Sequence, residues 1–458
     1  MNLSKLNGKK KKSTRLVVIF FICLLGIGFE ARSTSFSFRA GRGVLWTWVG
    51  GTQTGGSAGT YGTKGTPSTS NIPPARGYGC ADIDPSGDAW VFGGSLGSNT
   101  TLKNDLWRFR PSTGEWTWMS GSSGSAAGNT NAVYGTKGTP SVSNTPGERK
   151  ELACWTDSLG NFWVFSGLIS GSTNINDLWR FKPSTLEWTW MSGSNTTNAA
   201  SVFGTKGTEA AGNVPSGRER TTYWKDSSDN LWFYGGYDDA ASGRMGDLWR
   251  YRTSTGMWTW MSGSNTKDVV GVFGTKNTPS TSNFPGARRS NRGAVDSNGN
   301  FWFYGGDGLS NVKYSDLWKY DPTTNEWTWT AGPSASGQAG VYGTKLVANS
   351  ANNPKARSLG LVVTSLQGDI SVTMGYDGTG ELNDFSMYSP ASGNWTWLSG
   401  SSGTNAANTY GTINIPGWTN SPSGRDGMLS WIDATGALWI FGGYDAAYRN
   451  DLWKGKIY

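Results

Sequence analysis

Histidine is absent from the 458 residues of this chain. Catalytic sites that need an imidazole base, such as the Ser-His-Asp and Cys-His arrangements, are therefore excluded. Zinc sites with imidazole ligands are excluded for the same reason. Phosphate-binding loops are missing as well, because the Gly-Gly pairs of this sequence end apolar segments and do not open helices. These absences exclude many of the enzyme classes that are recognised by sequence motifs.

Cysteine is scarce. The sequence holds three cysteines, and the first, Cys23, lies in the apolar leader segment described below. The other two, Cys80 and Cys154, could be joined in an exported protein, or they could be two buried thiols. Of these alternatives we expect the two buried thiols.

Helical periodicity and long apolar runs are also missing after residue 40. Charged residues make up 16% of the chain, and the formal net charge is +8. Residues 1–31 hold six basic and one acidic residue, a net of +5, which leaves 34 basic and 31 acidic residues, a net of +3, for the rest. Because the rest is nearly neutral, the sequence does not indicate a nucleic-acid partner.

The first residues have a different pattern. A basic cluster of Lys5, Lys9 to Lys12 and Arg15 precedes 14 mostly apolar residues at 16–29. A basic segment followed by a short apolar one is typical of a secretory signal peptide. The apolar run is shorter than the roughly 20 residues of a membrane span, and an uncleaved signal anchor is the alternative. We predict a signal peptide at 1–31, a folded domain at 32–458, and a secreted or cell-envelope location, with membrane contact only if the leader stays attached.

Glycine, with 67 residues, and tryptophan, with 26, are abundant, and two tryptophan motifs recur six times. Variants of Asn-Asp-Leu-Trp place an aspartate at 105, 177, 247, 316, 384 and 451. Trp-Thr-Trp begins at 46, 116, 188, 258, 327 and 395. Both motifs run with spacings of 67 to 72 residues, so the chain is an array of six structural repeats.

Each repeat reads as four short strands. In the second repeat we expect strands at 149–155, 162–165, 177–182 and 187–191, separated by turns rich in Gly, Asn, Asp and Pro. Of the 26 tryptophans, 22 occupy positions that recur between repeats. Large flat side chains at such positions suit sheets that must bury both faces against neighbours. The pattern predicts an all-β propeller of six blades.

The two ends of the chain indicate how the ring closes. The last repeat stops at Tyr458 without a final Trp-Thr-Trp, whereas a spare copy, Trp46 to Trp48, precedes the first complete repeat. We therefore expect the N-terminal segment to supply the outer strand of the last blade. Closure of this kind removes exposed sheet edges.

The repeat resembles that of the Kelch family, which includes the propeller domain of galactose oxidase-like proteins. The resemblance rests on the apolar strand that ends in Gly-Gly, the aromatic residue of Asp-Leu-Trp and the later Trp of Trp-Thr-Trp, and it covers about residues 44–458. It implies a Kelch-type β-propeller with four antiparallel strands per blade. The copper site of galactose oxidase-like proteins needs histidine ligands, so we expect neither that chemistry nor any cofactor or metal here.

Six arginines are expected to begin the first strands and are candidates for ligand binding: Arg76, Arg149, Arg218, Arg288, Arg357 and Arg425. At the inner edge of each blade they would ring one mouth of the central channel. Guanidinium groups suit carboxylates and phosphates. The alternative is that each arginine pairs with a neighbouring carbonyl group or aspartate.

A residue that recurs in every repeat is expected to be scaffold, whereas one that differs is free to serve function. The recurring aspartate of Asp-Leu-Trp is then structural, and we expect it to accept from backbone amides. In the first strands, one equivalent position carries Asp82, Trp155, Trp224, Ala294, Val363 and Trp431. The three tryptophans at this position could form a surface on which a sugar stacks, or they could pack between blades.

Two further sets of residues leave alternatives open. Tyr/Phe-Gly-Thr-Lys recurs in the long links between blades, and we expect it to pack the link onto the blade; a ring of lysines for an anionic partner is the other interpretation. Acidic residues near the first strands could act as paired acid and base on a sugar. These residues are Glu148, Glu151, Glu219 and Asp426.

The loops predict where a ligand binds. In an antiparallel four-stranded blade, the loop between the second and third strands and the link to the next blade emerge on one side, and two short turns emerge on the other. The first side carries all the variable loops, at 95–103, 168–175, 237–244, 307–314, 376–382 and 444–449. We predict a monomeric, non-catalytic module that binds protein or carbohydrate on this side. The alternative is a sugar-modifying enzyme such as a Kelch-type sialic-acid mutarotase.

Overall fold

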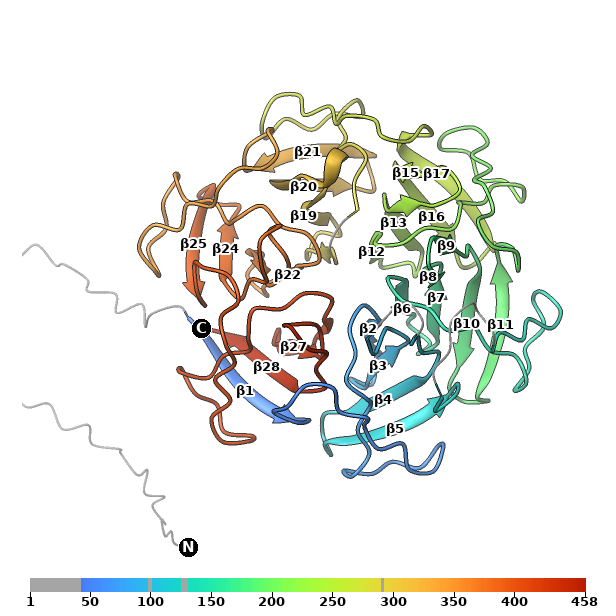
Figure 1. The fold of residues 1–458 in the computed structure, drawn as a ribbon. Helices are drawn as coiled ribbons and strands as arrows, with labels where there is room; N and C mark the ends of the chain where they lie inside the picture. The colour runs from blue at the N-terminus through green and yellow to red at the C-terminus, as the bar shows by residue number, and fades with distance from the viewer. Residues whose placement is uncertain (1–42, 98–100, 125–130, 290–291) are drawn as a thin grey trace, which may run out of the picture. The chain divides into compact units, whose positions relative to one another are not determined.

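The computed structural model describes residues 43–97, 101–124, 131–289 and 292–458. They belong to one compact unit, Gly41–Tyr458. In this unit six antiparallel four-stranded sheets stand in a ring, with their first strands nearest the centre (Figure 1). Among the described residues the 3-10 turn η1 (Leu309–Asn311) is the only helical element. The fold is a six-bladed β-propeller, as the repeat predicts.

The first three blades follow one another along the chain. Blade 1 consists of β2 (Cys80–Ile83), β3 (Ala89–Phe92), β4 (Leu106–Arg110) and β5 (Glu115–Ser120). Blade 2 consists of β6 (Ala153–Thr156), β7 (Phe162–Phe165), β10 (Leu178–Lys182) and β11 (Glu187–Ser192), with a small hairpin of β8 (Leu168–Ser170) and β9 (Thr173–Asn174). Blade 3 consists of β12 (Thr222–Lys225), β13 (Leu231–Tyr234), β16 (Gly246–Arg252) and β17 (Met257–Ser264), with the hairpin β14 (Tyr237–Asp238) and β15 (Gly243–Arg244).

The remaining blades complete the ring. Blade 4 consists of β18 (Ala294–Val295), β19 (Phe301–Asp307), β20 (Lys313–Asp321) and β21 (Glu326–Ala331). Blade 5 consists of β22 (Leu361–Thr364), β23 (Ile370–Thr373), β24 (Phe385–Ser389) and β25 (Asn394–Ser399). Blade 6 consists of β26 (Leu429–Ile432), β27 (Leu438–Phe441), β28 (Leu452–Ile457) and, from the other end of the chain, β1 (Val44–Gly50).

The second strands of the blades are buried on both faces because each blade packs between two others. Strands β3 and β7, for example, read Ala-Trp-Val-Phe and Phe-Trp-Val-Phe, and all their residues are buried. The indole N–H of Trp90 donates to Oδ2 of Asp84 in the preceding turn at 2.8 Å. Oδ1 of the same aspartate accepts from the backbone of Ser86 and Asp88. One carboxylate therefore fixes both the turn and the aromatic side chain that packs on the next blade.

The links between blades are held by the Tyr/Phe-Gly-Thr-Lys motif. Lys64 donates to the carbonyl of Gly121 at 2.9 Å, and its ammonium group lies 4.3 Å from the centre of the Trp118 ring. The same hydrogen bond and ring contact recur for Lys137, Lys206, Lys276 and Lys345. These contacts attach each link to its blade, as expected for this motif.

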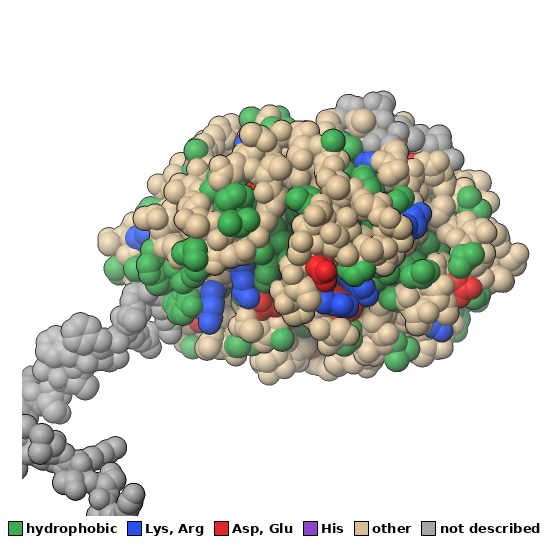
Figure 2. All heavy atoms as spheres, turned by 90° about the horizontal axis from the view of Figure 1, so that it is seen from below, with side chains coloured by type: hydrophobic (Ala, Val, Ile, Leu, Met, Phe, Trp, Pro, Cys, Tyr) green, Lys and Arg blue, Asp and Glu red, His purple; other side chains and the backbone are tan. Residues whose placement is uncertain are grey.

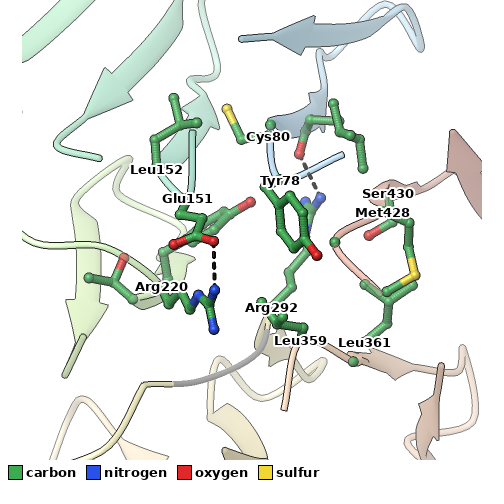
Figure 3. A pocket seen from close by; sticks show the side chains of 17 residues that line it. Tyr78, Cys80, Glu151, Leu152, Arg220, Arg292, Leu359, Leu361, Met428 and Ser430 are labelled. Atoms are coloured by element: carbon green, nitrogen blue, oxygen red, sulfur yellow. Dashed lines mark hydrogen bonds and ion pairs between the residues drawn. The ribbon is translucent and has the colours of Figure 1, made fainter. Parts of the chain in front are cut away.

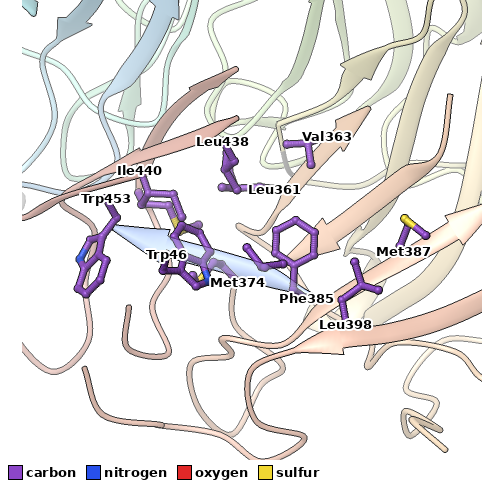
Figure 4. Packing of buried hydrophobic residues seen from close by; sticks show 12 residues of the cluster. Trp46, Leu361, Val363, Met374, Phe385, Met387, Leu398, Leu438, Ile440 and Trp453 are labelled. Carbon is purple, nitrogen blue, oxygen red and sulfur yellow. The ribbon is translucent and has the colours of Figure 1, made fainter. Parts of the chain in front are cut away.

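The ring closes through β1. This strand pairs with β28, with Trp48 opposite Trp453. Trp46, which is 3% exposed, belongs to a buried cluster that includes Ile440 and Trp453 of blade 6 and Phe385 of blade 5 (Figure 4). The predicted closure by an N-terminal strand is confirmed.

The expectation for the cysteines is wrong. Cys80 in β2 and Cys154 in β6 form a disulfide between the first strands of blades 1 and 2. Their Cα atoms are 6.0 Å apart, which is within the usual range for a disulfide. The two residues are 74 positions apart in the sequence, and only the packing of adjacent blades brings them together.

Closure predicts a strong effect of one buried tryptophan. We expect Trp46→Ala to lower the free energy of unfolding by about 3–5 kcal/mol, because it empties a core site and loosens the strand that closes the ring. Urea denaturation measures this change.

The matched control is Trp418→Ala, since Trp418 is 63% exposed and its loss is expected to cost at most about 0.5 kcal/mol. An unchanged midpoint for Trp46→Ala would contradict closure by β1.

Candidate ligand-binding site

The six predicted arginines lie in the interior of the blades. Each is at most 1% exposed, and each forms an ion pair with the aspartate of its own Asp-Leu-Trp motif: Arg76–Asp105, Arg149–Asp177, Arg218–Asp247, Arg288–Asp316, Arg357–Asp384 and Arg425–Asp451. The paired atoms are 2.5 to 2.9 Å apart. The structure therefore shows the pairing with aspartate that the sequence left open. A role of these arginines in ligand binding stays a prediction.

The aspartate of blade 1 shows what each pair does. Asp105 accepts two hydrogen bonds from Arg76, one from the indole of Trp107 and one from the hydroxyl of Tyr61 in the link. Burial alone would raise the pKa of Asp105, but the charge and hydrogen bonds of Arg76 lower it below its usual value. The structural role expected for this aspartate is present, but its side-chain partners are Arg, Trp and Tyr and not backbone amides.

The first strands begin later than expected. The prediction for blade 2 was a strand from Arg149, whereas β6 begins at Ala153. The reason is that Lys150 pairs with Leu168 of the loop that follows the second strand, and Glu151 has a left-handed backbone with φ of 57°. The segment after the arginine thus belongs to the mouth of the channel and not to the sheet.

The predicted stacking tryptophans lie deeper in the channel wall. Trp155 donates to the carbonyl of Trp224 at 2.7 Å, and Trp224 donates to the carbonyl of Trp302 at 3.2 Å. Trp224 stacks on Phe301 with 5.2 Å between ring centres. Trp431 stacks on its blade neighbour Trp439. All three predicted tryptophans are at most 2% exposed and serve packing between strands and blades, although they also border a channel chamber described below.

A ring of strained residues surrounds the mouth of the channel. The residue two positions after each arginine has a left-handed backbone in the five blades where it is described: Tyr78, Glu151, Arg220, Leu359 and Gly427, with φ between 54° and 60°. For a residue other than glycine this conformation costs about 1–2 kcal/mol. Such strain is often retained where side chains must be aimed at a ligand.

Backbone hydrogen bonds join this ring from blade to blade. The amide of Tyr78 donates to Gly427, that of Glu151 to Tyr78, and that of Arg220 to Glu151, at 2.6, 2.6 and 3.0 Å. Each blade thus fixes the position of the next. The side chains that the ring presents differ in every blade, which by the repeat criterion leaves them free for function.

The mouth is charged over blades 2 to 4. Arg220 lies 2.8 Å from Glu151 and 3.9 Å from Asp307. Arg289 lies 3.3 Å from Glu219 and 3.5 Å from Asp307. The carboxylates are nearly buried, whereas both arginines keep about a fifth of their side-chain surface exposed, at 22% and 18%. The acids of the network are thus shielded, whereas its two arginines stay partly open to solvent.

Two of the acids share a proton. Burial and the adjacent charge of Glu151 raise the pKa of Glu219 to about 8. Burial opposes ionisation of Glu151 too, but Arg220 and Lys150 lower its pKa to about 2. At neutral pH Glu219 is therefore a neutral donor and Glu151 a charged acceptor.

The mouth is aromatic over blades 6 and 1. Tyr78 donates to Asp426 at 2.9 Å and lies edge-on to Tyr448, with ring centres 6.2 Å apart. Tyr448 in turn contacts Tyr444 at 5.3 Å. Burial raises the pKa of Asp426 to about 6. Along the part of the outer edge seen in Figure 2, by contrast, the charged side chains are scattered among polar and apolar groups.

Below this mouth the channel narrows to a small recess of about 80 Å³. Tyr78, Glu151 and Arg220 reach into it from three different blades, and Arg292 crosses it (Figure 3). Beyond Arg292 lies a larger chamber of about 240 Å³, bordered by Trp155, Trp224 and Trp431. Both spaces border on Tyr223 and Arg292.

Sequence reasoning found part of this site. Glu151, Glu219 and Asp426 were considered as acids near the first strands, and the structure brings them to one mouth; Glu148 is buried beside Asn131 of the link. Tyr78, Arg220 and Arg289 were missed. A comparison of the two positions after each arginine would have found them, because these positions differ in all six repeats.

No protein-family model and no curated protein matches this sequence. Within the described ranges, no helix is long and apolar enough to cross a membrane. The same residues contain no group of three or more Cys, Asp or Glu side chains arranged to hold a metal ion.

The shared proton predicts a pH dependence. Because the pKa of Glu219 is raised above its value in the unfolded chain, its contribution to stability is fully present below about pH 4 and is lost as the pH rises toward 8. We expect Glu219→Gln, which keeps a neutral donor, to remove this loss between pH 5 and 8. Unfolding free energies of both proteins across this range measure the difference.

Glu187→Gln is the control, since Glu187 lies on the rim strand β11, away from the channel. Identical pH profiles for the wild type and Glu219→Gln would show that the two acids do not share a proton.

Proposed function

We propose that this protein is an exported Kelch-type propeller that binds protein or carbohydrate at the loop-side mouth of its channel, without catalysing a reaction. The observation that carries the proposal is that recurring and variable residues of each repeat lie in different places and make different contacts. The recurring Arg, Asp, Trp and Lys side chains are occupied in holding the blades. The side chains that differ between blades gather at the channel mouth.

The composition of the mouth supports binding. It combines Tyr78, Tyr444 and Tyr448 with Arg220 and Arg289, and these five residues are partly exposed. Tyrosine and arginine dominate the energetics of many binding surfaces, because each offers a large contact area and directed hydrogen bonds. The rigid ring beneath them limits the ordering cost on binding.

The geometry of the acids supports a non-catalytic role. Glycoside hydrolysis needs two carboxyl groups about 5 Å or more apart. Glu151 and Glu219 interact directly, and each shifts the pKa of the other, so they do not stand apart as such a pair requires. The same contact argues against their use as the acid and base of a sugar-modifying enzyme.

The disulfide supports export. Cys80–Cys154 is buried between two blades, and stable disulfides are typical of proteins that leave the cytoplasm. This agrees with the leader predicted at 1–31, which lies outside the described residues.

The binding face is tested by substitutions on the two sides of the ring. We expect Tyr444→Ala and Arg289→Ala each to weaken binding by about tenfold or more, because each removes an anchor of the mouth. Lys182→Ala, at the exposed end of β10 on the opposite side, is the control and leaves affinity unchanged. The measurement is a dissociation constant for each ligand found with a glycan array and with a panel of extracellular proteins.

If Lys182→Ala loses binding while the two mouth variants bind normally, the binding site lies on the side opposite to the one proposed. Melting curves of all variants show whether a loss of binding reflects a loss of fold.

A further inference from the structure

Arg292 departs from the repeat. It lies four residues after Arg288, and the other blades carry small or apolar residues or threonine at this position: Cys80, Ala153, Thr222, Leu361 and Leu429. Those five side chains are buried. In blade 4 the regular strand β18 has only two residues, and Arg292 precedes it. The repeat criterion therefore marks this arginine as a candidate for function.

The side chain of Arg292 spans the channel. It reaches from blade 4 to blade 1, on the far side of the ring (Figure 1). There Nη1 donates to the carbonyl of Ala81 at 2.6 Å, and Nη2 lies 3.0 Å from Oδ1 of Asp82. The central carbon of the same guanidinium group lies 5.7 Å from the centre of the Tyr223 ring. Figure 3 shows the side chain running across the recess, behind Tyr78.

The far end of this bridge is also specific to one blade. Asp82 stands where blades 2, 3 and 6 have tryptophan. Its other carboxylate oxygen accepts from the amide of Thr156 at 2.8 Å and from the hydroxyl of that residue at 3.0 Å. Asp82 is thus held by blade 2 while it holds Arg292, and three blades fix the bridge.

The bridge divides the channel. Above it is the recess of about 80 Å³, and below it the chamber of about 240 Å³. A ligand that enters from the loop side therefore meets the Arg292 side chain at the inner end of the recess. The recess is about half as large as the roughly 150 Å³ cavity that binds benzene, so it suits a small end group of a ligand.

The polar groups of the recess, which lie among apolar side chains such as Leu152 and Met428, define what fits there. Arg220 and Arg292 are donors, Glu151 is an acceptor, and the hydroxyl of Ser430 is both, whereas that of Tyr78 donates to Asp426 and can accept. Positive and negative charges are both present and paired. This mixture suits an uncharged hydroxylated group, because each of its hydroxyls donates one hydrogen bond and accepts others.

We propose, resting on the binding function proposed above, that the channel recognises the end of a glycan, and that Arg292 makes this selection by closing the recess. The terminal hydroxymethyl group of the sugar enters the recess, and the tyrosines at the mouth contact the ring of the same sugar. Units farther along the glycan stay outside and contribute less.

The test uses pairs of immobilised oligosaccharides that differ in one sugar. One member of each pair has a hexose at that place, and the other has the corresponding pentose, which lacks the hydroxymethyl group. For the wild type we expect about tenfold weaker binding when the pentose replaces the terminal hexose. We expect no change in affinity when the pentose replaces an interior hexose. Arg292→Met, which removes the bridge and keeps the stem, is expected to lose this difference.

Arg252→Met is the matched control, since Arg252 lies 3.1 Å from Glu209, away from the channel, and it keeps the wild-type preference. If Arg292→Met does not fold, Arg292→Lys serves instead, because lysine cannot reach both acceptors. Equal sensitivity to terminal and interior sugars overturns the proposal and leaves the binding function intact. Absence of glycan binding overturns it as well, and the proposed function is then judged by protein ligands and the mouth variants.

Discussion

The ring depends on a buried ion pair that is repeated six times. Each arginine holds the aspartate two strands away in its own blade and the carbonyl that ends the second strand, as Arg76 does with Asp105 and Gly93. Its own carbonyl accepts from the second glycine of the preceding blade, as Arg149 does from Gly94. A buried charge is costly without its partner, so the arginine and the aspartate occur together in every blade, and the second glycine accompanies them in all six.

This constraint separates scaffold from function within a few residues. The arginine and its glycine partners set the path of the chain at the inner edge of each blade. The next two residues follow that path into a left-handed turn and present their side chains at the channel. Because backbone atoms make the bonds of the ring from Gly427 to Arg220, the side chains can change without loss of the ring. A symmetrical scaffold can thus carry an asymmetrical mouth, charged on one half and aromatic on the other.

The sequence predicted the fold well because its motifs are periodic. The number of blades, the strands around Trp-Thr-Trp and the closure by Trp46 all follow from spacing. The start of the first strands was missed, since no composition signal marks the left-handed turn at Glu151. The disulfide was missed because it depends on contact between blades. The exposure of the arginines and the path of Arg292 across the channel depend on three-dimensional geometry that the repeat pattern does not contain.

The central claim is that the arginines hold the blades and that their neighbours bind. Arg357 and Asp384 test it most directly, because they form two bonds of 2.7 Å and the fifth repeat lacks the tryptophan that shares the aspartate elsewhere. We predict that Arg357→Met lowers the free energy of unfolding by about 3–5 kcal/mol, and that adding Asp384→Leu restores most of it, while the folded variants keep their affinity for ligand. An Arg357→Met protein that is as stable as the wild type and has lost its ligand would contradict the claim.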